Sequence, residues 1–381
     1  MSFQTEISTL GQRFESALRC RDARLNALEN VPEWPNGCPV SVDLGAGALQ
    51  NYGDAFGHRS LREEIAMRAH SIGHLSIDME NIAVSNGGLH ALDVIFSEFC
   101  GDDTVLFVQT PVLRSIAELA LQHNCTLVPL GDLTTEAARR RALDCIRTSG
   151  AKTKRPMVYL NTPNNPTGTI LDTAFVQRVQ KAINAFQGYL ILDEVYDAYC
   201  FDSAPIQDLD LTGLFRIGSM SKAFGLPGIR IGWVASTRQN AAKLAANLEI
   251  KCISVAGPSQ KIAVEMLRRG PADELFLQIE NNRKKAAANH KLMALCARNL
   301  PAGGTSLWAD QLDVDTEQFA TWLAETERLF VASGSNYWPD NVQGIRLPLG
   351  ISSERFSLVT ERLCSGLSQF KSQLQKETVH V

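Results

Sequence analysis

Short apolar runs alternate with longer amphipathic segments through the middle of the chain. The runs are rich in valine, isoleucine and leucine, whereas the segments between them repeat their apolar positions every three or four residues. The runs predicted as strands are 81–85, 104–109, 125–130, 156–161, 189–199 and 214–221, and the segments predicted as helices are 89–99, 113–123, 135–148 and 173–186. This alternation predicts an α/β fold, with a mostly parallel sheet covered by helices on both faces.

A smaller α+β domain is expected to follow the sheet. A long helical pattern over 271–300 is suited to bridge the two parts. Beyond it, strands are predicted at 305–313, 328–334 and 344–350, and amphipathic helices at 316–326 and 353–376. We therefore expect a large domain over 41–285 and a small C-terminal domain over 286–381. The N-terminal segment 1–40 is expected to join the small domain and to cover the functional site.

Composition and charge exclude several classes of function. Of the 381 residues, 45% are hydrophobic and 20% are charged, which is typical of a packed globular protein. The net charge of -4 is spread without long blocks of either sign, so no nucleic acid is expected as a partner. Nine scattered cysteines favour neither a disulfide framework nor a thiolate metal site. With no secretory or membrane-spanning signal recognised, we expect a cytoplasmic protein that binds no membrane and no metal.

Two loops after predicted strands carry candidate binding groups. Asn86, Gly87 and Gly88 open a helix, whose unpaired N–H groups and partial positive charge suit a phosphate. A tight turn explains the same glycines equally well. Asn165 lies in TPNNPTGTI, a proline-fixed loop at the carboxyl end of a strand, where open α/β sheets bind their ligands. An ordinary turn is the alternative, although it does not explain so many polar groups.

A carboxylate and a lysine complete the candidate chemistry. Asp193 ends a buried strand and requires a partner for its charge. The alternatives are an arginine of a neighbouring strand, a helix cap, or a protonated ring nitrogen of a cofactor. Lys222 lies among small residues, where a lysine deprived of its charge can condense with an aldehyde. Ser219, Ser221 and Arg230 flank it and could bind an anion. Taken alone, Lys222 would be a solvated surface residue.

Together these groups describe one ligand. Lys222 suits an aldehyde, Asp193 suits a pyridinium, and the Gly87 turn with Ser219 and Arg230 suits a phosphate. Asn165 and Tyr196 are donors for a phenolate oxygen. The combination predicts pyridoxal 5′-phosphate (PLP) as the cofactor.

From about residue 42 to residue 349 the chain resembles the fold-type I PLP-dependent enzymes, in particular the class I/II aminotransferases. The resemblance rests on NYGDAFGHRSLREEIA, SNGG, TPNNPTG, DEVYDAY, SMSKAFGLPGIRIGW and GIRLPLG, in this order. It implies a seven-stranded sheet, and a homodimer that takes an amino acid and a 2-oxo acid as substrates. The lysine motif is highly specific, whereas the Gly87 turn is not.

The resemblance implies a role for each site residue. Lys222 becomes the Schiff-base lysine and the base that moves the substrate proton, and Asp193 keeps the pyridine nitrogen protonated. Tyr196 and Asn165 bind the ring oxygen, Arg346 binds the substrate α-carboxylate, and Gly47 leaves space for substrate. Tyr52 reaches the phosphate in the partner subunit. The phosphate site in the same chain is implied to consist of Asn86, Gly87, Gly88, Ser219, Ser221 and Arg230.

One position departs from the family pattern. Relatives usually carry an aromatic residue two places after the proline of TPVLRS, stacked on the cofactor, and this chain has Leu113 there. We predict an aminotransferase of an L-amino acid, with a PLP-dependent lyase, cyclase or oxidase of specialised biosynthesis as the alternative. A non-catalytic PLP-binding regulator of DNA is a third hypothesis. It is disfavoured because the forty residues before the sheet are few and insufficiently basic.

Overall fold

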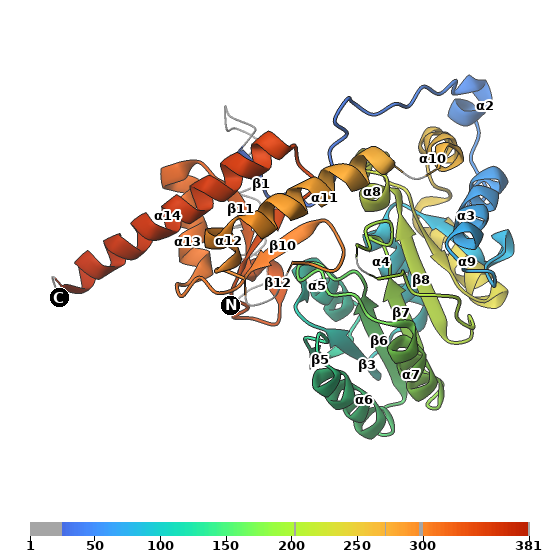
Figure 1. The fold of residues 1–381 in the computed structure, drawn as a ribbon. Helices are drawn as coiled ribbons and strands as arrows, with labels where there is room; N and C mark the ends of the chain where they lie inside the picture. Colours follow the sequence, from blue (N-terminus) through green and yellow to red (C-terminus); the bar gives the residue numbers. More distant parts are fainter. Residues whose placement is uncertain (1–24, 202, 271, 297–299, 380–381) are drawn as a thin grey trace.

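The computed structural model describes residues 25–379 except 202, 271 and 297–299, and forms two lobes (Figure 1). The larger lobe is built on a seven-stranded sheet. Its strands are, in spatial order, β2 (Ile82–Ser85), β9 (Gly232–Ala235), β8 (Leu214–Ser219), β7 (Tyr189–Asp193), β6 (Arg155–Asn161), β3 (Thr104–Gln109) and β5 (Thr126–Gly131). All neighbours pair in parallel except β9, which is antiparallel to both β2 and β8. The predicted α/β class and the mostly parallel sheet are confirmed.

Helices cover both faces of this sheet because its strands are apolar on both sides. Along β6, Met157 and Tyr159 face one core, and Val158 and Leu160 face the other. The first core is closed by α4 (Gly88–Phe99), α5 (Arg114–Gln122) and α9 (Arg238–Cys252), and the second by α3 (Arg59–Ser71), α6 (Glu136–Gly150), α7 (Thr173–Asn184) and α10 (Gly257–Arg269).

Short polar side chains fix where several of these helices begin. Thr135 accepts the N–H of Ala138 at the start of α6, and Asp172 accepts the N–H of Phe175 at the start of α7. Each contact satisfies a backbone donor that the first helical turn leaves unpaired. These caps align the helices with the strands that precede them.

The smaller lobe has its own core. A four-stranded sheet, in the order β1 (Asn26–Ala27), β11 (Phe330–Ser333), β13 (Ile345–Pro348) and β10 (Ser306–Ala309), packs against α11 (Asp273–Ala288), α12 (His290–Met293), α13 (Thr316–Trp322) and α14 (Ser353–Val379). A π-helical stretch, η4 (Leu323–Glu327), continues α13. Figure 1 shows α11 running across the junction of the lobes and α14 running out to the C-terminus. Leu275 and Ile279 of α11, which precede the predicted boundary at 285, are buried in this core.

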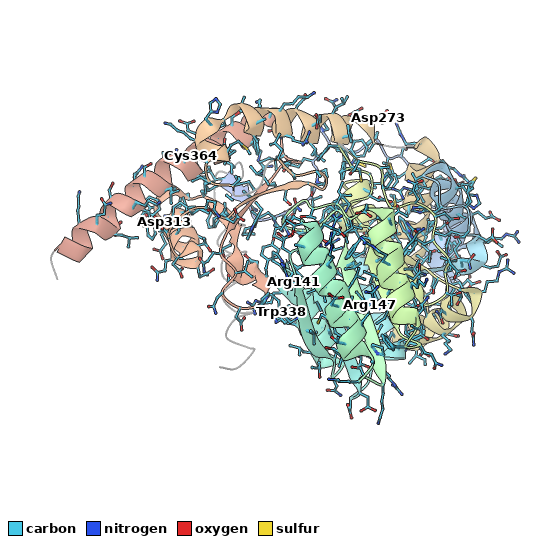
Figure 2. All side chains as sticks on the ribbon, turned by 60° about the horizontal axis from the view of Figure 1, so that its bottom comes forward. Arg141, Arg147, Asp273, Asp313, Trp338 and Cys364 are labelled. Carbon is cyan, nitrogen blue, oxygen red and sulfur yellow. The ribbon has the colours of Figure 1, made fainter. Side chains whose placement is uncertain are left out.

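A two-stranded ribbon joins the lobes. In it, β4 (Val112–Leu113) pairs antiparallel with β12 (Tyr337–Trp338), which places Leu113 opposite Tyr337. Figure 2 labels Trp338 where the small lobe meets the large one. Arg114 reinforces the ribbon, because its Nε lies 2.7 Å from the carbonyl oxygen of Ser335. The ribbon thus links the wall of the large lobe to the small lobe.

The remaining elements are short. They are α2 (Gly45–Gln50), η2 (Met79–Asn81), α8 (Met220–Ala223), η3 (Pro227–Ile229) and η5 (Gly334–Asn336). Among the described residues, no helix has the length and apolar character needed to cross a bilayer. Within the same part of the chain, no group of three or more histidine, cysteine or acidic side chains is placed to hold a metal ion.

Candidate active site

A pocket of about 230 Å³ opens at the carboxyl ends of the central strands, beside the start of α4. Leu89, Leu92, Val112, Leu113 and Ile116 give it an apolar wall. The residues predicted from sequence that line it are Gly88, Asn165, Asp193, Tyr196, Ser219, Ser221, Lys222 and Arg230. Residues from six separate parts of the chain therefore meet in one cavity, at the sheet edge where α/β folds bind ligands.

Asp193 ends β7 and is buried, with 7% of its surface exposed. Its Oδ2 accepts a hydrogen bond of 2.6 Å from the Tyr159 hydroxyl, and its Oδ1 accepts one of 3.2 Å from the N–H of Val195. Burial raises the pKa of Asp193 to about 6, although both hydrogen bonds act in the opposite direction. Tyr159, which the sequence analysis missed, lies on the adjacent strand β6 with its ring lining the pocket.

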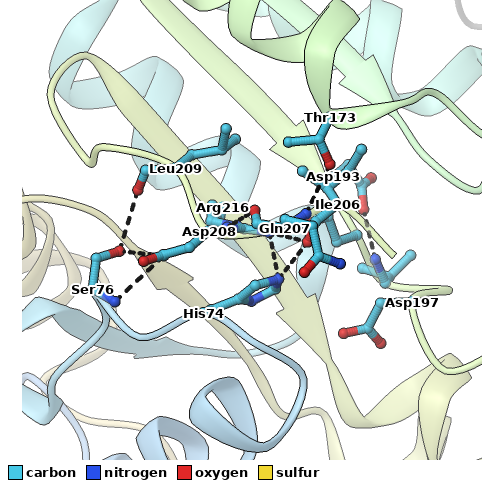
Figure 3. Close-up of polar contacts among 12 residues, drawn as sticks. His74, Ser76, Thr173, Asp193, Asp197, Ile206, Gln207, Asp208, Leu209 and Arg216 are labelled. Carbon is cyan, nitrogen blue, oxygen red and sulfur yellow. Dashed lines mark hydrogen bonds and ion pairs between the residues drawn. The ribbon is translucent and has the colours of Figure 1, made fainter. Parts of the chain in front are cut away.

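The neighbouring-strand arginine does not pair with Asp193. Arg216 of β8 instead binds Glu194, the next residue, through two contacts of 2.7 Å. Its Nη2 also lies 2.7 Å from Nε2 of His74 (Figure 3). Burial and the Arg216 charge lower the pKa of His74, whose Nε2 also lies 2.7 Å from the carbonyl oxygen of Ile206. This network satisfies Arg216, and among the described residues Asp193 forms no ion pair with Arg216 or with another cationic side chain.

Lys222 lies in α8, the single turn after β8. The Ser219 hydroxyl oxygen begins this turn by accepting the N–H of Ser221 at 3.0 Å. Lys222 Nζ donates to the carbonyl oxygen of Asn30 at 2.9 Å. Burial and the nearby Arg346 charge lower the pKa of Lys222 to about 7. Close to neutral pH a large fraction of the amine is therefore uncharged, as a nucleophile requires.

Arg230 lines the pocket, and Gly87 lies against its guanidinium. Gly87 caps α4 with a φ of 92°, and a Cβ there would lie 2.3 Å from Arg230 Nη2, so only glycine fits. Arg230 itself adopts a left-handed conformation, two residues before β9 begins, and donates to the carbonyl oxygen of Asn86 at 3.1 Å. The Asn86 side chain instead lies 3.7 Å from the Cys252 sulfur. Asn86 thus holds Arg230 through its backbone.

Arg346 enters from β13 of the small lobe and is buried, so it is not a surface arginine. Its Nη1 lies 3.1 Å from the Tyr337 hydroxyl and 3.4 Å from Asn165 Oδ1, and its Nη2 donates to the carbonyl oxygen of Leu28. Tyr337 also donates to Asn165 Oδ1 at 3.2 Å. Tyr337 is a second site residue that the sequence analysis missed.

Four described residues predicted for the site are not among those that line this pocket: Asn86, Gly87 and Arg346, described above, and Tyr52. Tyr52 follows α2, is 81% exposed, and does not line the pocket of its own chain. Gly47 falls within α2, and its surroundings lie outside the described residues. The carbonyl oxygen of Leu44 accepts a hydrogen bond from Lys261 of α10, which holds α2 against that helix.

The pocket fits PLP on three grounds. It joins a buried carboxylate that forms no ion pair with another described residue, an amine with a lowered pKa, and a glycine turn against an arginine. These match the ring nitrogen, the aldehyde and the phosphate in turn. Leu113 lines the wall as an aliphatic residue, so it could cover a bound cofactor but could not stack on it as an aromatic ring would.

Comparisons with known proteins identify the family of this chain. The model of the family "Aminotransferase class I and II" matches residues 29–307. An L-aspartate:5-guanidino-3-methyl-2-oxopentanoate transaminase of Pseudomonas syringae pv. syringae is 29% identical over 378 residues, covering 96% of this chain and 95% of its own. The 3-methylarginine biosynthesis aminotransferase ArgM of Streptomyces arginensis is 30% identical over 380 residues, covering 94% and 98%.

Solved structures of other aminotransferases share this fold. The N-succinyldiaminopimelate aminotransferase of Mycobacterium tuberculosis superposes with a TM-score of 0.81, covering 94% of this chain and 97% of its own, at 19% identity. The family match spans the seven-stranded sheet, the lysine turn and the residues that line the pocket. This chain therefore belongs to the PLP-dependent aminotransferases of class I and II.

Proposed function

We propose that this aminotransferase exchanges an amino group between an L-amino acid and a 2-oxo acid, one of which carries a guanidino side chain. The carrying observation is the similarity, over nearly the whole of both chains, to two enzymes named for guanidino substrates. The name of the second enzyme refers to biosynthesis of 3-methylarginine, and we propose specialised amino acid biosynthesis as the setting of this chain as well. The aminotransferase reading prevails over the lyase, cyclase or oxidase alternative, because these relatives are transaminases.

We assign the chemistry as follows. When bound, PLP supplies a ring that accepts the electron pair released at the substrate α-carbon. Asp193 would keep the ring nitrogen protonated, and Lys222, as a free amine, would take the α-proton and deliver it to the aldehyde-derived carbon of the cofactor. Arg346 binds the α-carboxylate through its two-pronged guanidinium, which Tyr337 and Asn165 orient.

The remaining polar groups bind the cofactor. Tyr196 and Asn165 donate to its ring oxygen, while Ser219, Ser221 and Arg230 bind its phosphate with the N–H groups of Gly87 and Gly88. Asn86 contributes by holding Arg230. Gly47 leaves room for substrate.

A homodimer belongs to the same proposal. The exposed Tyr52 would reach the phosphate bound by the partner subunit, which accounts for its distance from its own pocket. We also propose a cytoplasmic location, because eight described cysteines are free thiols, and a reducing compartment keeps thiols in that state.

A spectral screen tests this function. The purified holoprotein is mixed with L-amino acids, L-arginine and L-aspartate among them, and the expected products are the pyridoxamine form of the cofactor and a 2-oxo acid. Release of ammonia without the pyridoxamine form would show that the reaction is not transamination. Borohydride reduction and peptide mapping should find the cofactor on Lys222, and an unmodified Lys222 would refute the assigned site.

A further inference from the structure

Three consecutive residues of the N-terminal segment cross the active site. The carbonyl oxygen of Leu28 accepts from Arg346, and that of Asn30 accepts from Lys222. The Asn30 side chain also donates to the Tyr196 hydroxyl at 3.4 Å. The stretch Leu28–Asn30 therefore spans the gap between the guanidinium and the amine, two groups contributed by different lobes.

This crossing is anchored on both sides. Before it, Asn26 and Ala27 pair with β11 of the small lobe. After it, the N–H of Glu33 donates to the carbonyl oxygen of Gly350 at 2.8 Å, and the Glu33 carboxylate pairs with Arg355. The chain between these anchors is short, so it is held over the site. A ligand can replace the two carbonyl oxygens as hydrogen-bond partners of Arg346 and Lys222 without releasing the segment.

The proposed function places a substrate against this stretch. An amino acid whose carboxylate binds Arg346 and whose amino group lies beside Lys222 takes the places of the Leu28 and Asn30 carbonyls. Its side chain must then leave the site past the residue between them, Glu29. The Glu29 side chain is exposed and makes no hydrogen bond or ion pair to another described residue.

The charges around the site give Glu29 a distinct role. Arg346 and Arg230 make the site cationic, and the one acidic side chain among its described lining residues, Asp193, is engaged by Tyr159. Glu29 lies near enough to interact electrostatically with Lys222. A carboxylate at this position attracts a cationic substrate side chain and repels an anionic one.

Resting on the function proposed above, we infer that Glu29 selects the substrate side chain by binding the guanidinium of an arginine-type amino acid. A carboxylate and a guanidinium match in shape, because both can form two parallel hydrogen bonds. Glu29 is thus a specificity residue, and it takes no part in the proton transfer.

Kinetics with L-arginine and L-citrulline test this inference, because citrulline has the same shape but a neutral ureido group. In the holoenzyme, Glu29→Gln should lower kcat/KM for arginine about tenfold, the value expected when one charged hydrogen-bond acceptor is lost. The value for citrulline should stay within about twofold, since the neutral ureido group forms no ion pair for the substitution to remove. Glu29→Asp should restore part of the arginine preference.

A control and a binding measurement separate recognition from damage to the segment. Glu33→Gln alters the same segment at a position away from the site. It should change kcat/KM for arginine and for citrulline by the same factor. For 5-guanidinopentanoate, which lacks the amino group and cannot react, Glu29→Gln should raise the Kd measured from the cofactor absorbance. Equal losses for arginine and citrulline would overturn the inference. If other amino acids form pyridoxamine phosphate but arginine does not, the inference fails while the aminotransferase assignment stands.

Discussion

At the scale of single residues, two side chains set the chemistry of the pocket. Lys222 has its pKa lowered from 10.5 to about 7 because the charged form loses water and faces Arg346. Asp193 has its pKa raised to about 6, with Tyr159 opposing the shift. Burial thus moves the base and the acid toward neutrality from opposite directions.

The Lys222 shift predicts a pH dependence of cofactor binding. The amine gains its free-base form as pH rises through about 7, so the fraction of apoprotein that takes up PLP in a fixed short time should rise between about pH 6 and pH 8. Absorbance of the bound cofactor measures this. Arg346→Gln removes a positive charge that disfavours the ammonium, and should move the midpoint to higher pH. An unchanged midpoint would contradict this account.

The same shift predicts how stability varies with pH. Between about 7 and 10.5 the folded chain has released the Lys222 proton while the unfolded chain retains it. Stability rises with pH wherever the unfolded state binds more protons. The free energy of unfolding of the apoprotein should therefore increase as the pH rises through this window, because the buried amine of Lys222 no longer carries a charge. Denaturant unfolding of wild type and Lys222→Met at both ends of the window checks it, and the variant should lack this rise.

Tyr159→Phe should lower the fraction of bound PLP whose ring nitrogen is protonated. Loss of the 2.6 Å hydrogen bond raises the pKa of Asp193 further, so the carboxyl holds its own proton more often. A hydrogen bond to a charged group contributes about 1.5–3 kcal/mol, so we expect PLP affinity to fall about tenfold or more. The resonance of 15N-labelled PLP should move toward the unprotonated ring.

Tyr189→Phe is the matched control for that experiment. Tyr189 begins β7, at the other end of the strand from Asp193, and its ring packs on Phe99 and Phe215. Its substitution should leave the nitrogen resonance unchanged. If Tyr159→Phe also leaves the resonance unchanged, Tyr159 only fills space.

At the scale of elements, the buried pair of Glu194 and Arg216 ties the end of β7 to β8. Both side chains are at most 7% exposed. Glu194→Gln leaves the Arg216 charge uncompensated and should lower the free energy of unfolding by about 3–5 kcal/mol. On the exposed face of α3, Glu63→Gln breaks the ion pair with Arg59. This substitution should lower the free energy of unfolding by less than about 1 kcal/mol. Chemical denaturation of both variants measures the difference, and equal losses would contradict it.

At the scale of the whole molecule, the exposed Tyr52 predicts sites shared between two subunits. Tyr52→Ala and Lys222→Ala homodimers should each be nearly inactive. Mixing them in equal amounts should restore about a quarter of wild-type activity, because half of the random dimers are hybrids with one intact site each. Activity after subunit exchange measures this, and no recovery would mean that Tyr52 acts within its own chain or not at all.

The sequence by itself determined the fold class and the local motifs. Alternating strand and helix patterns, the glycine turn at Gly87 and the lysine turn at Lys222 depend on neighbouring residues, so short-range chemistry specifies them. Tyr159 looked like one more apolar strand residue, and nothing local marked Tyr337 as a partner of Arg346. Only the tertiary structure decided these contacts, and the crossing of Leu28–Asn30 between Arg346 and Lys222. Each joins residues far apart in sequence, and their meeting depends on strand order and on how the two lobes pack.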